Sequence, residues 1–202
     1  MKKRFLAVCA AMLMLSIMVT GCSGSATDEI KLGVVAPITG QNAIGGQYIK
    51  NGVNLAVEEF AKDGLTVGDK TFKVTVLFED NENKPEITAN AFRKLIDQDK
   101  VIAIVGPDAS MTALAGAPIA QTAKVPVVTT FATNPKVTQA GDYIFRACFI
   151  DPFQGKVMAE YAAQNLQAKK AAVLYNNGND FSKGLTEFFT QRFKELGGEV
   201  VA

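Results

Sequence analysis

Short apolar runs alternate along the chain with longer segments whose apolar residues recur every three or four positions, and few folds accommodate that order. The short runs are typical of strands, and the periodic segments are typical of helices that pack by one face. Such an alternation predicts an α/β fold in which an open, Rossmann-like parallel sheet is covered by helices on both faces. We expect strands at residues 30–36, 72–78, 101–105, 125–129, 143–149 and 171–175, and helices at residues 48–62, 85–97, 111–122, 153–165 and 181–196.

An isolated extended segment followed by a fresh alternation predicts two lobes. We expect a nearly complete N-terminal lobe at residues 30–145, a hinge crossover at residues 146–151 and the start of a second lobe at residues 152–202. The last residues, after a helix-ending glycine pair, are typical of the beginning of another strand. We therefore expect a truncated form of a longer protein.

The N-terminus predicts export. Basic residues 2–4 precede an apolar run at residues 5–19, which is short for a bilayer span and typical of a secretory signal peptide. Small residues then lead to Cys22, as in the lipobox of bacterial lipoproteins. We expect residues 1–21 to be a lipoprotein signal peptide, Cys22 to carry lipid and residues 22–29 to form a polar tether. The domain would be held at the outer face of the cytoplasmic membrane or in the periplasm; a plain signal peptide with a chance cysteine is the alternative.

Composition argues against several functions. There is no His, which is the commonest general base and metal ligand, and there is no Trp, which weakens a sugar-binding hypothesis. Lys and Arg number 21 against 20 Asp and Glu, so no basic excess predicts a nucleic-acid partner. After removal of the leader and lipidation of Cys22, Cys148 stands alone and is expected to be a small buried residue. No cofactor and no metal is expected.

Two loops at the carboxyl ends of predicted strands are the candidate ligand site, because ligands of open α/β sheets bind there. Residues 106–110 open a helix whose free N–H groups favour a carboxylate. Residues 129–135 offer hydroxyls and carbonyls for an ammonium group. Together these loops predict a cradle for a zwitterion. The alternative for Ser110 is an N-cap, and for Thr133 and Asn134 it is a capping or turn role.

Two other polar stretches are expected to serve structure rather than binding. Asp80 and Asn81 lie in a polar segment at residues 79–83, which is typical of a turn. The glycine-rich residues 40–46 contain neither G-x-G-x-x-G nor G-K-[ST], so no nucleotide site is expected there.

Several motifs together resemble the leucine/isoleucine/valine-binding protein family, the type I periplasmic binding proteins of ABC importers. The resemblance covers residues 30–202. It rests on Ile30-Lys31-Leu32-Gly33 with Pro37-Ile38-Thr39-Gly40, Asn51-Gly52-Val53-Asn54-Leu55-Ala56, Gly106-Pro107 with Ser110, Pro126-Val127-Val128 with Ala132-Thr133-Asn134-Pro135, and Phe145-Arg146 with Gln154-Gly155.

The resemblance implies roles in the first lobe. Ser110 would bind the ligand α-carboxylate, and Phe131 or Ala132 would contribute backbone contacts. Thr133 would contact the carboxylate by its N–H and the ammonium by its hydroxyl.

It also implies the rest of the pocket. Asp108 and Ala109 would line it, and Phe181 would stack on the ligand from the second lobe. The aromatic residue that many members carry near Ile44 is missing here, which leaves the preferred ligand side chain open. The acid that pairs with the ammonium would lie beyond Ala202.

These observations predict a solute receptor rather than an enzyme. A branched-chain or related amino acid would bind between two lobes, and a membrane ABC permease would recognise the closed form. The alternatives are the same fold binding amides, aromatic acids or short peptides, or acting as a sensory module. An exported α/β hydrolase is disfavoured because the chain has neither His nor a G-x-S-x-G elbow.

Overall fold

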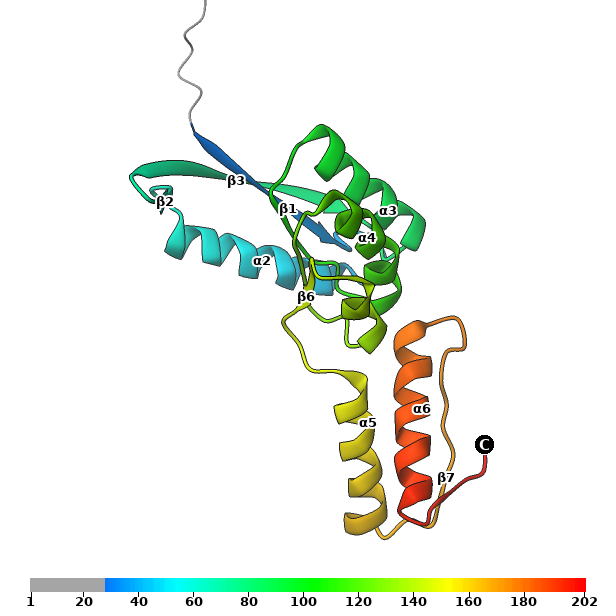
Figure 1. Ribbon diagram of the computed structural model, residues 1–202. Coiled ribbons are helices and arrows are strands. Elements are labelled where there is room, and N and C mark those ends of the chain that lie inside the picture. The colour runs from blue at the N-terminus through cyan, green and yellow to red at the C-terminus, as the bar shows by residue number, and fades with distance from the viewer. Residues whose placement is uncertain (1–27) are drawn as a thin grey trace, which may run out of the picture.

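The computed structural model describes residues 28–202, and Figure 1 shows a larger body built around a sheet and a separate pair of long helices. The predicted signal peptide and the lipidation site at Cys22 lie outside the described residues. Glu29, predicted to end the tether, is instead the first residue of strand β1, because it pairs with Lys73 of β3. Within residues 28–202 no helix has both the length and the apolar character that a membrane crossing requires.

A six-stranded sheet forms the larger body, in the order β2-β3-β1-β4-β5-β6. Every neighbouring pair is parallel except the β2–β3 hairpin, which confirms the predicted α/β architecture. The strands are β1 (Glu29–Ala36), β2 (Leu65–Val67), β3 (Lys70–Asp80), β4 (Ala103–Val105), β5 (Val127–Thr129) and β6 (Ile144–Arg146), with a separate parallel pair β7 (Lys170–Ala171) and β8 (Glu199–Val200).

The predicted helices are all present, with shifted ends. They are α2 (Ala43–Phe60), α3 (Pro85–Arg93), α4 (Ser110–Ala123), α5 (Asp151–Glu160) and α6 (Asp180–Glu195), with π-helical turns η2 (Lys94–Gln98) and η4 (Tyr161–Asn165) after α3 and α5, and a 3-10 helix η3 (Pro135–Ala140). Helix α2 begins five residues before its predicted start at residue 48. The reason is Gly46, where an added Cβ atom would lie 2.1 Å from the Pro37 carbonyl oxygen. A glycine there lets the first turn of α2 pack on the preceding loop.

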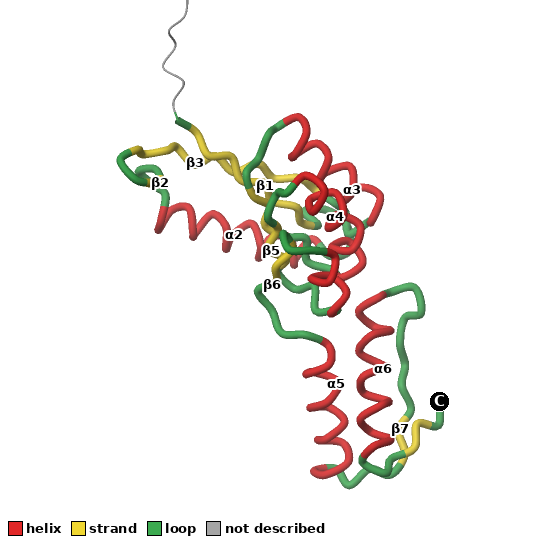
Figure 2. Tube along the Cα trace, viewed as in Figure 1, coloured by secondary structure: helices red, strands yellow, loops and turns green. Residues whose placement is uncertain are grey.

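The core lies on both faces of the sheet, because successive side chains of a strand point to opposite sides. In β1, Val34 packs with Ile49 of α2, whereas Val35 packs with Phe92 of α3. Helix α2 therefore covers one face, and α3 and α4 cover the other, as Figure 2 shows. These three helices hold the loops at the carboxyl ends of β1, β4 and β5 in fixed places.

The second body consists of α5 and α6, which pack along each other, and the short β7–β8 pair. The prediction of a buried strand at residues 171–175 is wrong, because β7 ends at Ala171 and Leu174 is fully exposed. A buried parallel strand needs neighbours on both edges and helices on both faces. In the described residues β7 pairs with β8 alone. Cys148, predicted to be buried, is only half-buried, because it lies on the link between β6 and α5 outside the sheet.

Candidate ligand-binding site

The loop after β4 is clamped between the neighbouring strands. Gly106 has a φ of +95°, and a Cβ atom there would lie 2.1 Å from the Val35 carbonyl oxygen of β1. The amide of Gly106 donates to the Val128 carbonyl of β5 at 2.9 Å. Only glycine allows this close approach, and the contact fixes the start of the loop that leads to Ser110.

Ser110 joins the two predicted loops. It is the first residue of α4 and is 2 % exposed. Its Oγ accepts a hydrogen bond from the backbone N–H of Asn134 at 3.2 Å. The N-cap position is occupied by Ala109, and no side chain caps α4, so the capping role considered for Ser110 is not the one observed. The hydroxyl proton of Ser110 remains available to a ligand oxygen beside the positive end of the helix.

Thr133 and Asn134 have different surroundings. The Oδ1 of Asn134 accepts from the Lys136 amide at 3.0 Å and caps η3, as the turn alternative predicted. Its Nδ2 donates to the Asp180 carbonyl at the start of α6, also at 3.0 Å. The Thr133 hydroxyl is buried and has no hydrogen-bond partner among the described residues. The Thr133 hydroxyl lies near the Asp151 carboxylate, and the loop that carries it is joined to Ser110 through the backbone of Asn134.

Arg146 fixes the loop that carries Thr133, a role that the sequence analysis missed. Its guanidinium donates to the carbonyls of Ala132 at 2.8 Å, Asn134 at 3.0 Å and Pro135 at 3.3 Å, and to the Thr138 hydroxyl at 2.7 Å. The planar fork of arginine suits such convergent acceptors. A single arginine within an otherwise apolar extended segment was the available signal.

Asp151 is a second missed residue, at the junction of the two bodies. It is fully buried at the start of α5, and its amide donates to the Thr133 carbonyl at 3.0 Å. Neither carboxylate oxygen has a partner among residues 28–202. Burial raises the pKa of Asp151, and the neighbouring Thr133 hydroxyl and Arg146 charge offset only part of that rise. Asp151 packs against Gly184 of α6, where an added Cβ would lie 3.2 Å from Oδ2.

The remaining candidates are divided between two places. Ala132 is fully buried under the loop, and Phe131 is exposed beside it. Asp108 and Ala109 lie half-buried on the loop after β4. Phe181 lines a separate apolar pocket of about 360 Å³ formed by α5, α6 and residues 172–175. Its stacking on a ligand held by Ser110 stays a prediction.

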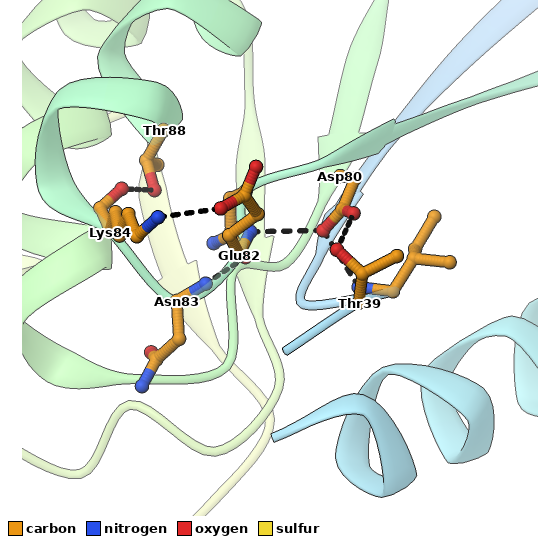
Figure 3. A network of polar contacts seen from close by, with 8 residues as sticks. Thr39, Asp80, Glu82, Asn83, Lys84 and Thr88 are labelled. Atoms are coloured by element: carbon orange, nitrogen blue, oxygen red, sulfur yellow. Dashed lines mark hydrogen bonds and ion pairs between the residues drawn. The ribbon is translucent and has the colours of Figure 1, made fainter. Parts of the chain in front are cut away.

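The loop between β1 and α2 is fixed by Asp80 at the end of β3 (Figure 3). The carboxylate of Asp80 accepts from the amides of Ile38 and Glu82, each at 2.9 Å, and from the Thr39 hydroxyl at 2.5 Å. Burial acts to raise the pKa of Asp80, but these hydrogen bonds outweigh it, so the pKa lies below its usual value. Asp80 thus holds the turn, as predicted.

Known proteins match both the sequence and the structure. The sequence profile of a family described as periplasmic binding protein matches residues 29–202. A Leu/Ile/Val-binding protein homolog 3 from Brucella melitensis is 34% identical over 178 residues, which are 88% of this chain and 47% of that protein.

Two solved structures share the fold. The leucine binding protein LivK from Thermotoga maritima superimposes with a TM-score of 0.79 and 42% identity, covering 85% of this chain and 47% of that one. A solute binding protein of an ABC transporter from Rhodopseudomonas palustris, in complex with 3,4-dihydroxybenzoic acid, gives a TM-score of 0.77 and 33% identity, covering 86% and 46%. The chain thus spans about half the length of the relatives it matches.

Proposed function

The chain belongs to the periplasmic binding protein family and shares its type I fold, and on this premise we propose that it is an extracytoplasmic solute-binding lipoprotein of an ABC importer. Its ligand is a branched-chain or related amino acid, bound between two lobes and delivered to a membrane permease. The chain acts as a receptor and not as an enzyme. The observation that carries the proposal is the hydrogen bond from the Asn134 amide to Ser110 Oγ, which unites the two loops into one polar cradle.

The cradle suits the head group of an amino acid. The carboxylate is stabilised by the free N–H groups of the first turn of α4 and by the Ser110 hydroxyl. The ammonium is accepted by the buried Thr133 hydroxyl and by the Phe131 backbone carbonyl, because the carbonyls of residues 132–135 already accept from Arg146 or Asp151. Hydrogen bonds to charged groups contribute roughly 1.5–3 kcal/mol each, so two or three of them with apolar burial reach about −8 kcal/mol, which is micromolar affinity.

The two lobes are placed on either side of this cradle. We infer that residues 30–145 form the N-terminal lobe, that residues 146–151 are a hinge crossover and that residues 152–202 begin the second lobe. Figure 1 supports this division, because the chain leaves the sheet after β6 and enters the α5–α6 pair. The ligand favours the closed arrangement to the extent that it binds that arrangement more tightly.

A thermal-shift screen of amino acids on the full-length gene product tests the proposal. Leu, Ile or Val is expected to raise the melting temperature, and the double substitution Ser110→Ala with Thr133→Ala is expected to erase the rise. Thr122→Ala is the matched control, because this exposed threonine lies near the far end of α4 and bonds only the Pro118 carbonyl. The absence of a shift with every amino acid tested would overturn the assignment.

Aromatic acids are the second candidate ligand class, because the Rhodopseudomonas palustris relative was solved with 3,4-dihydroxybenzoic acid. Such a ligand has a carboxylate but no ammonium. It is therefore expected to depend on Ser110 and to tolerate Thr133→Ala, whereas an amino acid depends on both residues. The same screen separates the two classes.

Membrane anchoring follows from Cys22, which lies before the described residues. We expect Cys22→Ser to move the full-length protein from the membrane fraction to the soluble extract of cells. Retention in the membrane fraction after this substitution, without detergent, would contradict lipid attachment at Cys22.

A further inference from the structure

The order of strands gives the cradle a second side. Strands β1, β4 and β5 are neighbours in the sheet, so the loop after β4 has one neighbouring loop on each side. The proposed head-group cradle lies between the loops after β4 and β5, where Ser110 meets Asn134. Any group that extends from the head group away from β5 enters the space between the loops after β4 and β1.

Asp108 faces that second space. Its Oδ2 lies 3.9 Å from the position of a Cβ atom added to Gly45, which belongs to the first turn of α2 after β1. Apart from this oxygen, the added atom would meet nothing within 4 Å. Gly45 therefore leaves open space, and the carboxylate of Asp108 borders it.

One oxygen of the half-buried Asp108 carboxylate lacks a hydrogen-bond partner among the described residues. Its Oδ1 is buried and accepts no hydrogen bond from the described residues, and none of the salt bridges within residues 28–202 includes Asp108. Burial raises the pKa of this carboxyl, and the backbone N–H groups of Asp108 and Ala109 offset only part of the rise. A buried acceptor in this condition gains most from a donor that a ligand brings.

We propose that Asp108 contacts the side chain of the bound amino acid and selects ligands whose side chain carries a hydrogen-bond donor. The inference rests on the proposed function, because Ser110 and Thr133 must hold the head group for the side chain to reach Asp108. A purely aliphatic ligand side chain would shield the Asp108 carboxylate from water without donating a hydrogen bond to it. This lowers the affinity for such a ligand. The donor is either a neutral hydroxyl or amide, or a cationic group.

Calorimetric titration of the full-length gene product tests this selection with ligand pairs of nearly equal shape. Threonine is compared with valine and asparagine with leucine. Lysine, which represents the cationic ligands, is also compared with leucine. In at least one comparison the donor-bearing ligand is expected to bind about tenfold or more tightly than its aliphatic partner, the factor of one hydrogen bond to a charged group. Asp108→Leu is expected to abolish this preference. The control Asp142→Leu changes an exposed aspartate just before β6, at the amino edge of the sheet, and is expected to keep it.

Asp108→Asn distinguishes the two kinds of donor. The amide keeps an acceptor oxygen but no charge, so selection of a neutral donor is expected to survive this change and selection of a cation to be lost. The inference would be overturned if the wild-type protein bound valine and leucine as tightly as their donor-bearing counterparts or more tightly, or if Asp108→Leu kept the preference. Either result would leave the proposed function standing. Binding of no amino acid would overturn both.

Discussion

Replacement of Arg146 by methionine is expected to loosen the loop that carries Thr133. The substitution keeps most of the apolar stem and removes four hydrogen bonds, three of them to backbone carbonyls. At about 1.5 kcal/mol for each bond, the low end for a bond to a charged donor, the four bonds together contribute about 6 kcal/mol before solvent is considered. Arg146 is only half-buried, so water replaces part of what is lost. We therefore expect the free energy of unfolding to fall by roughly 2–4 kcal/mol.

Urea denaturation of Arg146→Met measures this loss, and calorimetric titration with the best ligand from the screen measures its effect on binding. Arg93→Met is the matched control, because Arg93 is exposed and donates a single long bond of 3.3 Å to Asn90. The control is expected to stay within about 0.5 kcal/mol of the wild-type protein. Equal stability of the two variants would show that the Arg146 bonds do not hold the loop, and the reasoning would be refuted.

Two further substitutions test the packing of α4 and the buried acid at the junction. Gly116→Ala on α4 is expected to destabilise the protein by roughly 1–3 kcal/mol in thermal unfolding, because its Cβ would lie 2.6 Å from ring atoms of the fully buried Phe92. Gly52→Ala on α2, where an added Cβ meets nothing within 4 Å, is the control and is expected to stabilise the protein by about 0.5–1 kcal/mol. If Gly116→Ala stabilised the protein as well, the close packing of Gly116 on Phe92 would be contradicted. Asp151→Asn is expected to gain stability relative to the wild-type protein as pH rises above 3.8, the ordinary pKa of aspartate. The raised pKa of Asp151 in the folded state stabilises the wild-type fold while the acid is protonated. The wild-type protein loses this contribution as the acid ionises, and asparagine, which does not ionise, loses nothing. A stability difference that stays constant between pH 3 and about pH 7 in urea titrations would contradict this account.

The parts of the fold that follow from burial were predictable from the sequence. The apolar run at residues 101–105 predicted β4, and Ile104 at its centre is buried in the core under α3 and α4. Strand β2 was not expected, because all three of its residues are exposed and it forms only by pairing with residues 70–72 of β3 in a hairpin. A strand without a buried side chain leaves no hydrophobic pattern to detect.

The site was predictable where side-chain type carries the chemistry. Ser110 and Thr133 follow strands whose ends meet at one edge of the sheet, and the structure brings their loops together. Arg146 was missed because its partners are mostly backbone carbonyls, which every residue has and which no residue type reveals. Asp151 was missed because its burial depends on α6 packing across it, a contact that only the tertiary structure defines.

The loop after β5 is also one place where the two bodies touch. Asn134 donates to the Asp180 carbonyl of α6, and the Thr133 carbonyl accepts from the Asp151 amide of α5. Asp151 lies near the Thr133 hydroxyl that is proposed to hold the ligand. A ligand changes the arrangement of two bodies only through contacts that differ between the arrangements. On the proposed function, ligand binding and lobe closure are therefore coupled through residues 133–134, and substitutions there are expected to alter affinity and closure together, whereas those at Asp108 alter affinity alone.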